Sequence, residues 1–144
     1  MKGALGAAVL AAATWIIAPV MAADISSLVG EWSGAAEAVV IGGGGYRPGT
    51  QTLMDPPFTD ERVFDYSIKG QDGRRFWGEI RSGDRTEPLA GALSLDGKTA
   101  YGADTDGHFH LTVPSANEME LCYTQAAIGP DHQIVATCFL IKRK

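Results

Sequence analysis

The sequence has few cysteines, no surplus of positive charge and no recognisable catalytic motif. Its 144 residues include 2 Cys, and 12 Lys and Arg stand against 17 Asp and Glu, which gives a formal net charge of −5. An acidic chain of this kind is unsuited to binding nucleic acid or an anionic membrane surface. Because spacing supports no nucleophile motif and no carboxylate pair, we expect no enzymatic activity, no cofactor and no metal.

Disorder over most of the chain is also excluded by composition. Hydrophobic residues make up 45% of the sequence and charged residues 20%, both near the average of globular proteins. The length fits one folded domain.

The first 22 residues have the pattern of a secretory signal peptide. A basic start precedes an apolar stretch at 3–18, and Ala22 supplies the small residue needed before the cleavage point. An uncleaved membrane anchor is the alternative, since the stretch approaches the ~20 residues that span a bilayer. Pro19 and the small residues that follow favour cleavage. We therefore expect a signal peptide at 1–22 and one domain at 23–144, periplasmic or secreted and free of the membrane when mature.

Export changes the interpretation of the two cysteines. In an oxidising compartment a lone pair is more often a disulfide than a metal or redox site. Residues 118–124 and 133–142 both have strand patterns, and a turn is expected between them at 128–131. A hairpin of these two strands can place Cys122 directly opposite Cys138.

The same register produces further matched pairs. It places Glu118 opposite Lys142 and Leu121 opposite Phe139, so that one face is apolar and the other carries the cysteines and an ion pair. We therefore predict a cross-strand disulfide between the two cysteines. Two free thiols are the alternative.

The remainder of the mature chain has the rhythm of short strands. Turn signals such as Asp-Gly recur about every ten residues, and hydrophobic residues alternate with polar ones between them. No convincing helix follows the signal peptide. The expected strands lie near 28–41, 61–69, 74–81, 86–94, 98–103, 108–113, 118–125 and 133–142.

This series predicts an all-β fold. Eight sequential strands joined by short turns close most simply into an antiparallel up-and-down barrel, which also removes exposed edges. A two-sheet β-sandwich is the alternative.

The first expected strand opens with Gly30-x-Trp32, after a short polar stretch at 24–27. Together with the strand count and a basic end at Lys142 or Arg143, this resembles the calycin barrels, the lipocalins and avidins. The resemblance implies that Trp32 plugs the closed end of an eight-stranded barrel and that the basic residue packs over it. From the residues alone, Trp32 is a large core anchor.

The inner wall is expected to combine small and aromatic side chains. A barrel of eight strands is either filled by side chains or holds one small ligand. The small residues of the first strand face aromatic ones, which permits an apolar pocket and equally permits large-against-small packing. The side chains expected to line a ligand site are Trp32, Tyr46, Phe64, Tyr66, Phe109 and Tyr123.

Residues 42–60 form the one long irregular stretch. Its glycines and prolines do not suit a regular strand, and a loop of this length is usually functional or mobile. It is expected either to cover the barrel mouth as a lid, with Tyr46, Arg47 and Phe58 as contacts, or to be a flexible excursion.

Three other groups of residues have a structural interpretation that outweighs a functional one. His108 and His110 share a strand face with the spacing of metal ligands, but the other face of that strand is apolar, so they are expected to point to water. Residues 104–107 resemble a fragment of a calcium loop and are better explained as a hairpin turn. Trp77 beside Arg75 is expected to be a packed aromatic on a solvated face, with a protein or glycan contact as the alternative.

Three functions stay open, and the last of them is a hydrolase whose site shows no recognisable motif. The first is an exported binding barrel that holds a small apolar molecule in its lumen. The second is a barrel with a filled core that interacts with a protein, as small periplasmic protease-inhibitor barrels do.

Overall fold

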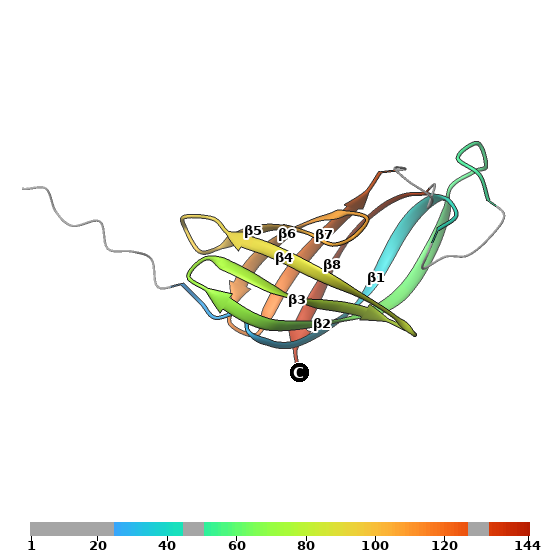
Figure 1. The fold of residues 1–144 in the computed structure, drawn as a ribbon. Coiled ribbons are helices and arrows are strands. Elements are labelled where there is room, and N and C mark those ends of the chain that lie inside the picture. The colour runs from blue at the N-terminus through green and yellow to red at the C-terminus, as the bar shows by residue number, and fades with distance from the viewer. Residues whose placement is uncertain (1–24, 45–50, 127–132) are drawn as a thin grey trace, which may run out of the picture.

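The computed structural model describes residues 25–44, 51–126 and 133–144, and these form eight antiparallel strands in one closed barrel (Figure 1). No helix in this part of the chain is long and apolar enough to cross a membrane. The predicted signal peptide at 1–22 and the turn at 128–131 lie outside the described residues. The strands are β1 (Gly30–Gly42), β2 (Phe58–Asp72), β3 (Arg75–Ser82), β4 (Arg85–Leu93), β5 (Thr99–Ala103), β6 (His108–Ser115), β7 (Glu118–Gln125) and β8 (Gln133–Arg143).

The predicted up-and-down barrel is confirmed. Each strand pairs with its neighbours in sequence, and β1 also pairs with β8, which closes the sheet and leaves no edge strand. The alternative, a two-sheet sandwich, is therefore not the fold.

The expected loop at 42–60 is shorter than predicted. β2 begins at Phe58, which pairs with Val40 of β1, so Phe58 belongs to a strand and not to a lid. The physical reason is packing, because its half-buried ring covers Ala38 and Val40 inside the barrel. Tyr46 and Arg47 lie outside the described residues.

Alternation along the strands separates a buried inner face from an exposed outer face. In β6, Phe109 and Leu111 are buried, whereas His108 is exposed and His110 half-buried on the opposite face. This confirms the orientation predicted for the two histidines. His110 lies against the ring of Tyr101 on the outside of the barrel, with 4.8 Å between the ring centroids.

Trp32 closes one end of the barrel. Its side chain is fully buried, and its indole Nε1 donates a hydrogen bond to the Leu28 carbonyl oxygen at 2.9 Å. The Arg143 guanidinium lies over the indole, with its central carbon 4.1 Å from the ring centroid. Of the two basic residues considered, Arg143 therefore covers the tryptophan, whereas Lys142 points outward toward Glu118 at 3.6 Å.

Arg143 also ties three segments together. Its guanidinium donates hydrogen bonds to the carbonyl oxygens of Ser27 at 3.0 Å, Val29 at 2.7 Å and Ala116 at 3.0 Å. Two of these acceptors precede β1 and the third lies in the β6–β7 turn. The closed end is therefore held by one side chain from the last strand.

The disulfide and its register are as predicted. Cys122 and Cys138 are directly opposite and bonded, and the same ladder pairs Glu118 with Lys142. Leu121 pairs with Phe139 on the buried face, and the cysteines lie on the outer one. The bond thus locks a hairpin whose register is also set by packing and charge.

Replacing both cysteines by Ala is expected to lower the free energy of unfolding by about 3 kcal/mol, the chain-entropy value for a loop of this length. The register should survive, because Leu121 and Phe139 stay paired. Urea unfolding of the variant and of the reduced parent measures the loss. An unchanged midpoint in both would contradict it.

Replacing Arg143 by Lys is expected to destabilise the barrel by about 1–3 kcal/mol, because one ammonium cannot reach three carbonyl groups and cover the indole. Lys142→Arg on the outer face is the control and should be near neutral. Denaturant unfolding measures both variants, and amide exchange at 27–29 should increase only in R143K. An equal loss of unfolding free energy in the two variants would contradict this role of Arg143 at the closed end.

Candidate functional site

The end of the barrel opposite Trp32 is its mouth. In an up-and-down barrel alternate strand ends meet, so the last residues of β1, β3, β5 and β7 lie there together with the first residues of β2, β4, β6 and β8. This end carries polar side chains that face inward, in contrast to the apolar closed end.

A cavity of about 30 Å³ lies inside the barrel below the mouth. Aromatic rings wall its deeper part, and polar groups from β7, β8 and the β5–β6 turn complete it. Its volume admits one or two water-sized groups, since a single water needs about 10–15 Å³. The lining side chains are Phe64, Tyr66, Ile80, Asp104, Tyr123, Gln125, Val135, Thr137 and Phe139.

The structure brings together half of the predicted ligand-lining residues. Phe64, Tyr66 and Tyr123 all line the cavity. Trp32 lies at the closed end, away from it. Phe109 packs deep in the core against Phe76, with ring centroids 6.5 Å apart. The sixth residue of the set, Tyr46, is outside the described part of the chain.

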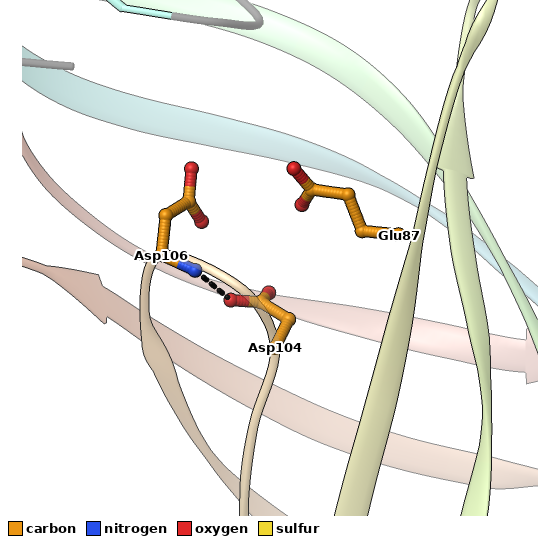
Figure 2. A group of neighbouring side chains, drawn as sticks. All are labelled: Glu87, Asp104 and Asp106. Carbon is orange, nitrogen blue, oxygen red and sulfur yellow. Dashed lines mark hydrogen bonds between the residues drawn. The ribbon is translucent and has the colours of Figure 1, made fainter. Parts of the chain in front are cut away.

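Three carboxylates meet at the rim of the mouth (Figure 2). Glu87 points inward from β4, and Asp104 and Asp106 belong to the β5–β6 turn. One oxygen from each lies within 4.8 Å of the others. The predicted hairpin turn at 104–107 is confirmed, because Asp104 Oδ1 accepts hydrogen bonds from the backbone N–H groups of Asp106 at 3.2 Å and Gly107 at 2.8 Å.

Neighbouring side chains hold two of these carboxylates in place. The Tyr123 hydroxyl donates to Asp106 Oδ1 at 2.7 Å. The Arg85 guanidinium donates to Glu87 Oε1, with Nε at 2.8 Å. Two strands and a turn therefore position the acidic cluster, which consists of Glu87, Asp104 and Asp106.

Burial governs the electrostatics of the cluster. Loss of hydration, followed by the charges of Asp106 and Glu87, raises the pKa of Asp104 from 3.8 to about 6, against the opposing effect of its two backbone hydrogen bonds. Burial and the nearby carboxylates also raise the pKa of Tyr123 far above its ordinary value. Tyr123 is therefore a neutral hydrogen-bond donor.

A pair of buried amides lies beside the cavity. Gln133 Nε2 donates a hydrogen bond to Gln125 Oε1 at 2.6 Å. Gln133 is 0% exposed and Gln125 is 4% exposed. Among the described residues, neither Gln125 Nε2 nor Gln133 Oε1 has a hydrogen-bond partner. Buried polar atoms are rarely left unpaired, so these two atoms mark a polar position beside the cavity that the described residues leave unsatisfied.

Sequence reasoning missed Glu87 and the two glutamines. Glu87 alternates with Leu89 and Leu93 on the inner face of β4, and Gln133 and Gln125 occupy inward positions at strand ends. A polar residue in phase with a buried apolar series was the signal that could have revealed each of them.

Trp77 is placed on the outer face as expected. It is 49% exposed, and part of its ring lies over Gly70, where a Cβ would approach the indole to 2.4 Å. Gly70 marks a β-bulge between β2 and β3. One part of the Trp77 ring is thus packed on Gly70, and the rest is exposed to solvent.

Asp104→Asn is expected to stabilise the protein at neutral pH. A folded-state pKa raised to about 6 means that the stabilisation from the bound proton is complete below about pH 4 and lost as the pH rises through 6. Asn keeps the acceptor oxygen without the charge. The free energy of unfolding of D104N should therefore exceed that of the parent by about 1–2 kcal/mol near pH 7.5 and equal it near pH 4. Urea unfolding at both pH values measures this.

Asp96→Asn is the matched control in the exposed β4–β5 turn. Hydrogen bonds from the Ser94 hydroxyl and the Lys98 backbone lower the pKa of Asp96. The ionised Asp96 carboxylate therefore stabilises the folded state above its unfolded pKa, and this stabilisation is lost as the pH falls through the lower folded-state pKa. D96N should accordingly be less stable than the parent near neutral pH. If both substitutions changed the free energy of unfolding in the same direction near neutral pH, burial would be ruled out as the cause of the effect at Asp104.

We compared the chain with known protein families and with curated protein sequences. No family matches it, and no curated sequence matches it. Its function therefore has to be inferred from the barrel and its mouth.

Proposed function

We propose that the protein is an exported binding barrel that holds one end of a small molecule in the cavity below its mouth. One observation carries the proposal: the cavity is walled by aromatic rings and bordered by Gln125, whose buried Nε2 donates to no described residue. A mostly apolar wall with a few placed polar groups is the usual composition of a ligand site.

The size of the cavity restricts what can enter it. At about 30 Å³, it is far below the roughly 300–1,000 Å³ of a site that encloses a whole drug-sized molecule. The ligand is therefore expected to insert a small apolar end, such as a methyl group or a ring edge. A hydrogen-bond acceptor at that end would satisfy Gln125 Nε2, and the rest of the molecule would extend into the mouth.

The closed end supports a calycin-like interpretation of the barrel. Trp32 is buried under the Arg143 guanidinium, which is the arrangement that the resemblance implies for Gly30-x-Trp32 and a basic residue late in the last strand. In calycin barrels the lumen above such a plug is the ligand site, and the cavity described here lies on that side of Trp32.

Export is proposed on two grounds. The residues at 1–22 have the signal-peptide pattern, and a disulfide joins Cys122 to Cys138. Disulfides persist in oxidising compartments, which favours a periplasmic or secreted protein.

A protein-interaction barrel is the second candidate, and the outer face favours it. Trp77 and Tyr101 are 49% and 65% exposed. They lie on β3 and β5, on either side of β4. Trp77 pairs with Ala90 of β4 and Tyr101 pairs with Ala92 of β4, so the two aromatic residues belong to the same part of the outer surface. Large half-exposed aromatics on one face are typical of contact surfaces.

Filling the cavity tests the first candidate. Val135 is buried and lines the cavity, so Val135→Phe should block it. We expect the parent to bind the neutral probe N-phenyl-1-naphthylamine, and V135F to bind it about tenfold more weakly or not at all. Val39→Phe makes the same change on the outer face of β1 and should leave binding unchanged. Fluorescence titration measures all three proteins.

Native mass spectrometry of the protein purified without denaturation separates the two candidates. A small-molecule mass that accompanies the parent and is absent from V135F would support the ligand site. A protein adduct that persists in V135F, together with no binding of the probe by the parent, would overturn the ligand site and favour the interaction barrel.

A further inference from the structure

The acidic cluster at the mouth has the composition of a cation site. We propose that Glu87, Asp104 and Asp106 bind a divalent cation that prefers oxygen ligands, of the Ca²⁺ type. This proposal is independent of the ligand in the cavity, because Glu87 and Asp106 do not line the cavity and only Asp104 borders both.

The geometry of the three carboxylates matches a shared ion. One oxygen from each lies within 4.8 Å of the others, and two ligands of Ca²⁺ are separated by at most about 5 Å, twice the Ca–O distance of 2.3–2.6 Å. Figure 2 shows the Glu87 side chain extending from β4 toward the turn that carries the two aspartates. The carboxylates therefore converge from two separate elements.

Unpartnered oxygens are the second and independent observation. The Glu87 side chain is 6% exposed, and its Oε2 has no hydrogen-bond partner among the described residues. Asp106 Oδ2 is likewise buried and without a partner there. A charged oxygen that is buried without a partner destabilises the folded protein. A bound cation would compensate the charges of Glu87 Oε2 and Asp106 Oδ2 and so remove much of this cost.

The local charge balance favours a dication. Three carboxylates gather here, and the Arg85 guanidinium contacts one of them at Glu87 Oε1. A dication would add positive charge beside the oxygens of Glu87 and Asp106 that have no hydrogen-bond partner among the described residues. Asp104 is held by two backbone N–H groups and Asp106 by the Tyr123 hydroxyl, so the oxygens are positioned before an ion arrives.

Calcium suits this arrangement better than magnesium does. Ca²⁺ accepts six to eight oxygens in irregular geometry and tolerates ligands from several segments, whereas Mg²⁺ demands a near-ideal octahedron at about 2.0–2.1 Å. Three carboxylates from a strand and a turn supply part of a calcium sphere, and the position at the mouth gives water access to the rest.

Terbium luminescence tests the proposal directly, because Tb³⁺ replaces Ca²⁺ at oxygen sites. The Tyr123 hydroxyl is hydrogen-bonded to Asp106 at 2.7 Å, so excitation of this ring should sensitise an ion bound there. We expect saturable emission from the full chain at neutral pH that Ca²⁺ displaces, and that Mg²⁺ displaces only at higher concentration. Ca²⁺ should also raise the melting temperature.

Glu87→Gln is the decisive variant, since it keeps the side-chain shape and removes one charge. We expect its Tb³⁺ and Ca²⁺ affinities to fall about tenfold or more. Glu79→Gln, on the outer face of the adjacent strand β3, removes the same charge away from the cluster and should bind like the parent. Asp106→Asn provides a second variant in case E87Q does not fold, as judged by circular dichroism.

The outcomes are clear on both sides. Loss of emission in E87Q or D106N with retention in E79Q supports the site. The absence of saturation by about 5 mM Ca²⁺, above the 10⁻⁴–10⁻³ M range of weak extracellular sites, overturns it. Equal affinities in the parent, E87Q and D106N would also overturn it, and would leave the cavity proposal unaffected.

Discussion

The barrel depends on the closure of β1 against β8, the contact between its most distant strands. The two strands pair at both ends, Trp32 with Arg143 and Gly42 with Gln133. Between these pairs the backbones approach so closely at Gly34 that a Cβ would lie 2.2 Å from the Leu140 carbonyl oxygen. Only glycine permits this contact. Closure is costly in chain entropy because the paired residues lie 91 to 111 positions apart in the sequence, and the stacking and hydrogen bonds of Arg143 offset that cost where the last strand ends.

Closure in turn creates a gradient of polarity along the lumen. Trp32 and the residues around it exclude water at one end, aromatic rings occupy the middle, and carboxylates and amides face inward at the mouth. An inward polar group is tolerated where water, a ligand or an ion can reach it, and is prohibitive where none can. The polar positions at the mouth are therefore the part of the inner wall that packing alone does not explain.

Much of the fold follows from local pattern. Alternation and turn residues predict the eight strands, and the pair of Cys122 and Cys138 predicts the last hairpin because the correct register also satisfies Glu118 and Lys142. The mouth was less predictable. Glu87 and Asp104 are 17 positions apart in the sequence, and they meet only because β4 and β5 are adjacent and the β5–β6 turn bends inward. One-dimensional spacing does not record such a convergence, whereas a charged residue in phase with buried leucines does hint at it.

The distribution of stabilising features also has a functional meaning. The disulfide and the Arg143 contacts strengthen the barrel through its last two strands and its closed end, whereas the mouth contains a carboxyl whose pKa is raised by burial and polar atoms that lack partners. Local conflicts of this kind are selected against unless they serve binding, because they reduce the margin of stability. Several such features lie at one end of the barrel, and none of comparable cost lies at the other among its described residues, which is why we propose that its function lies at the mouth.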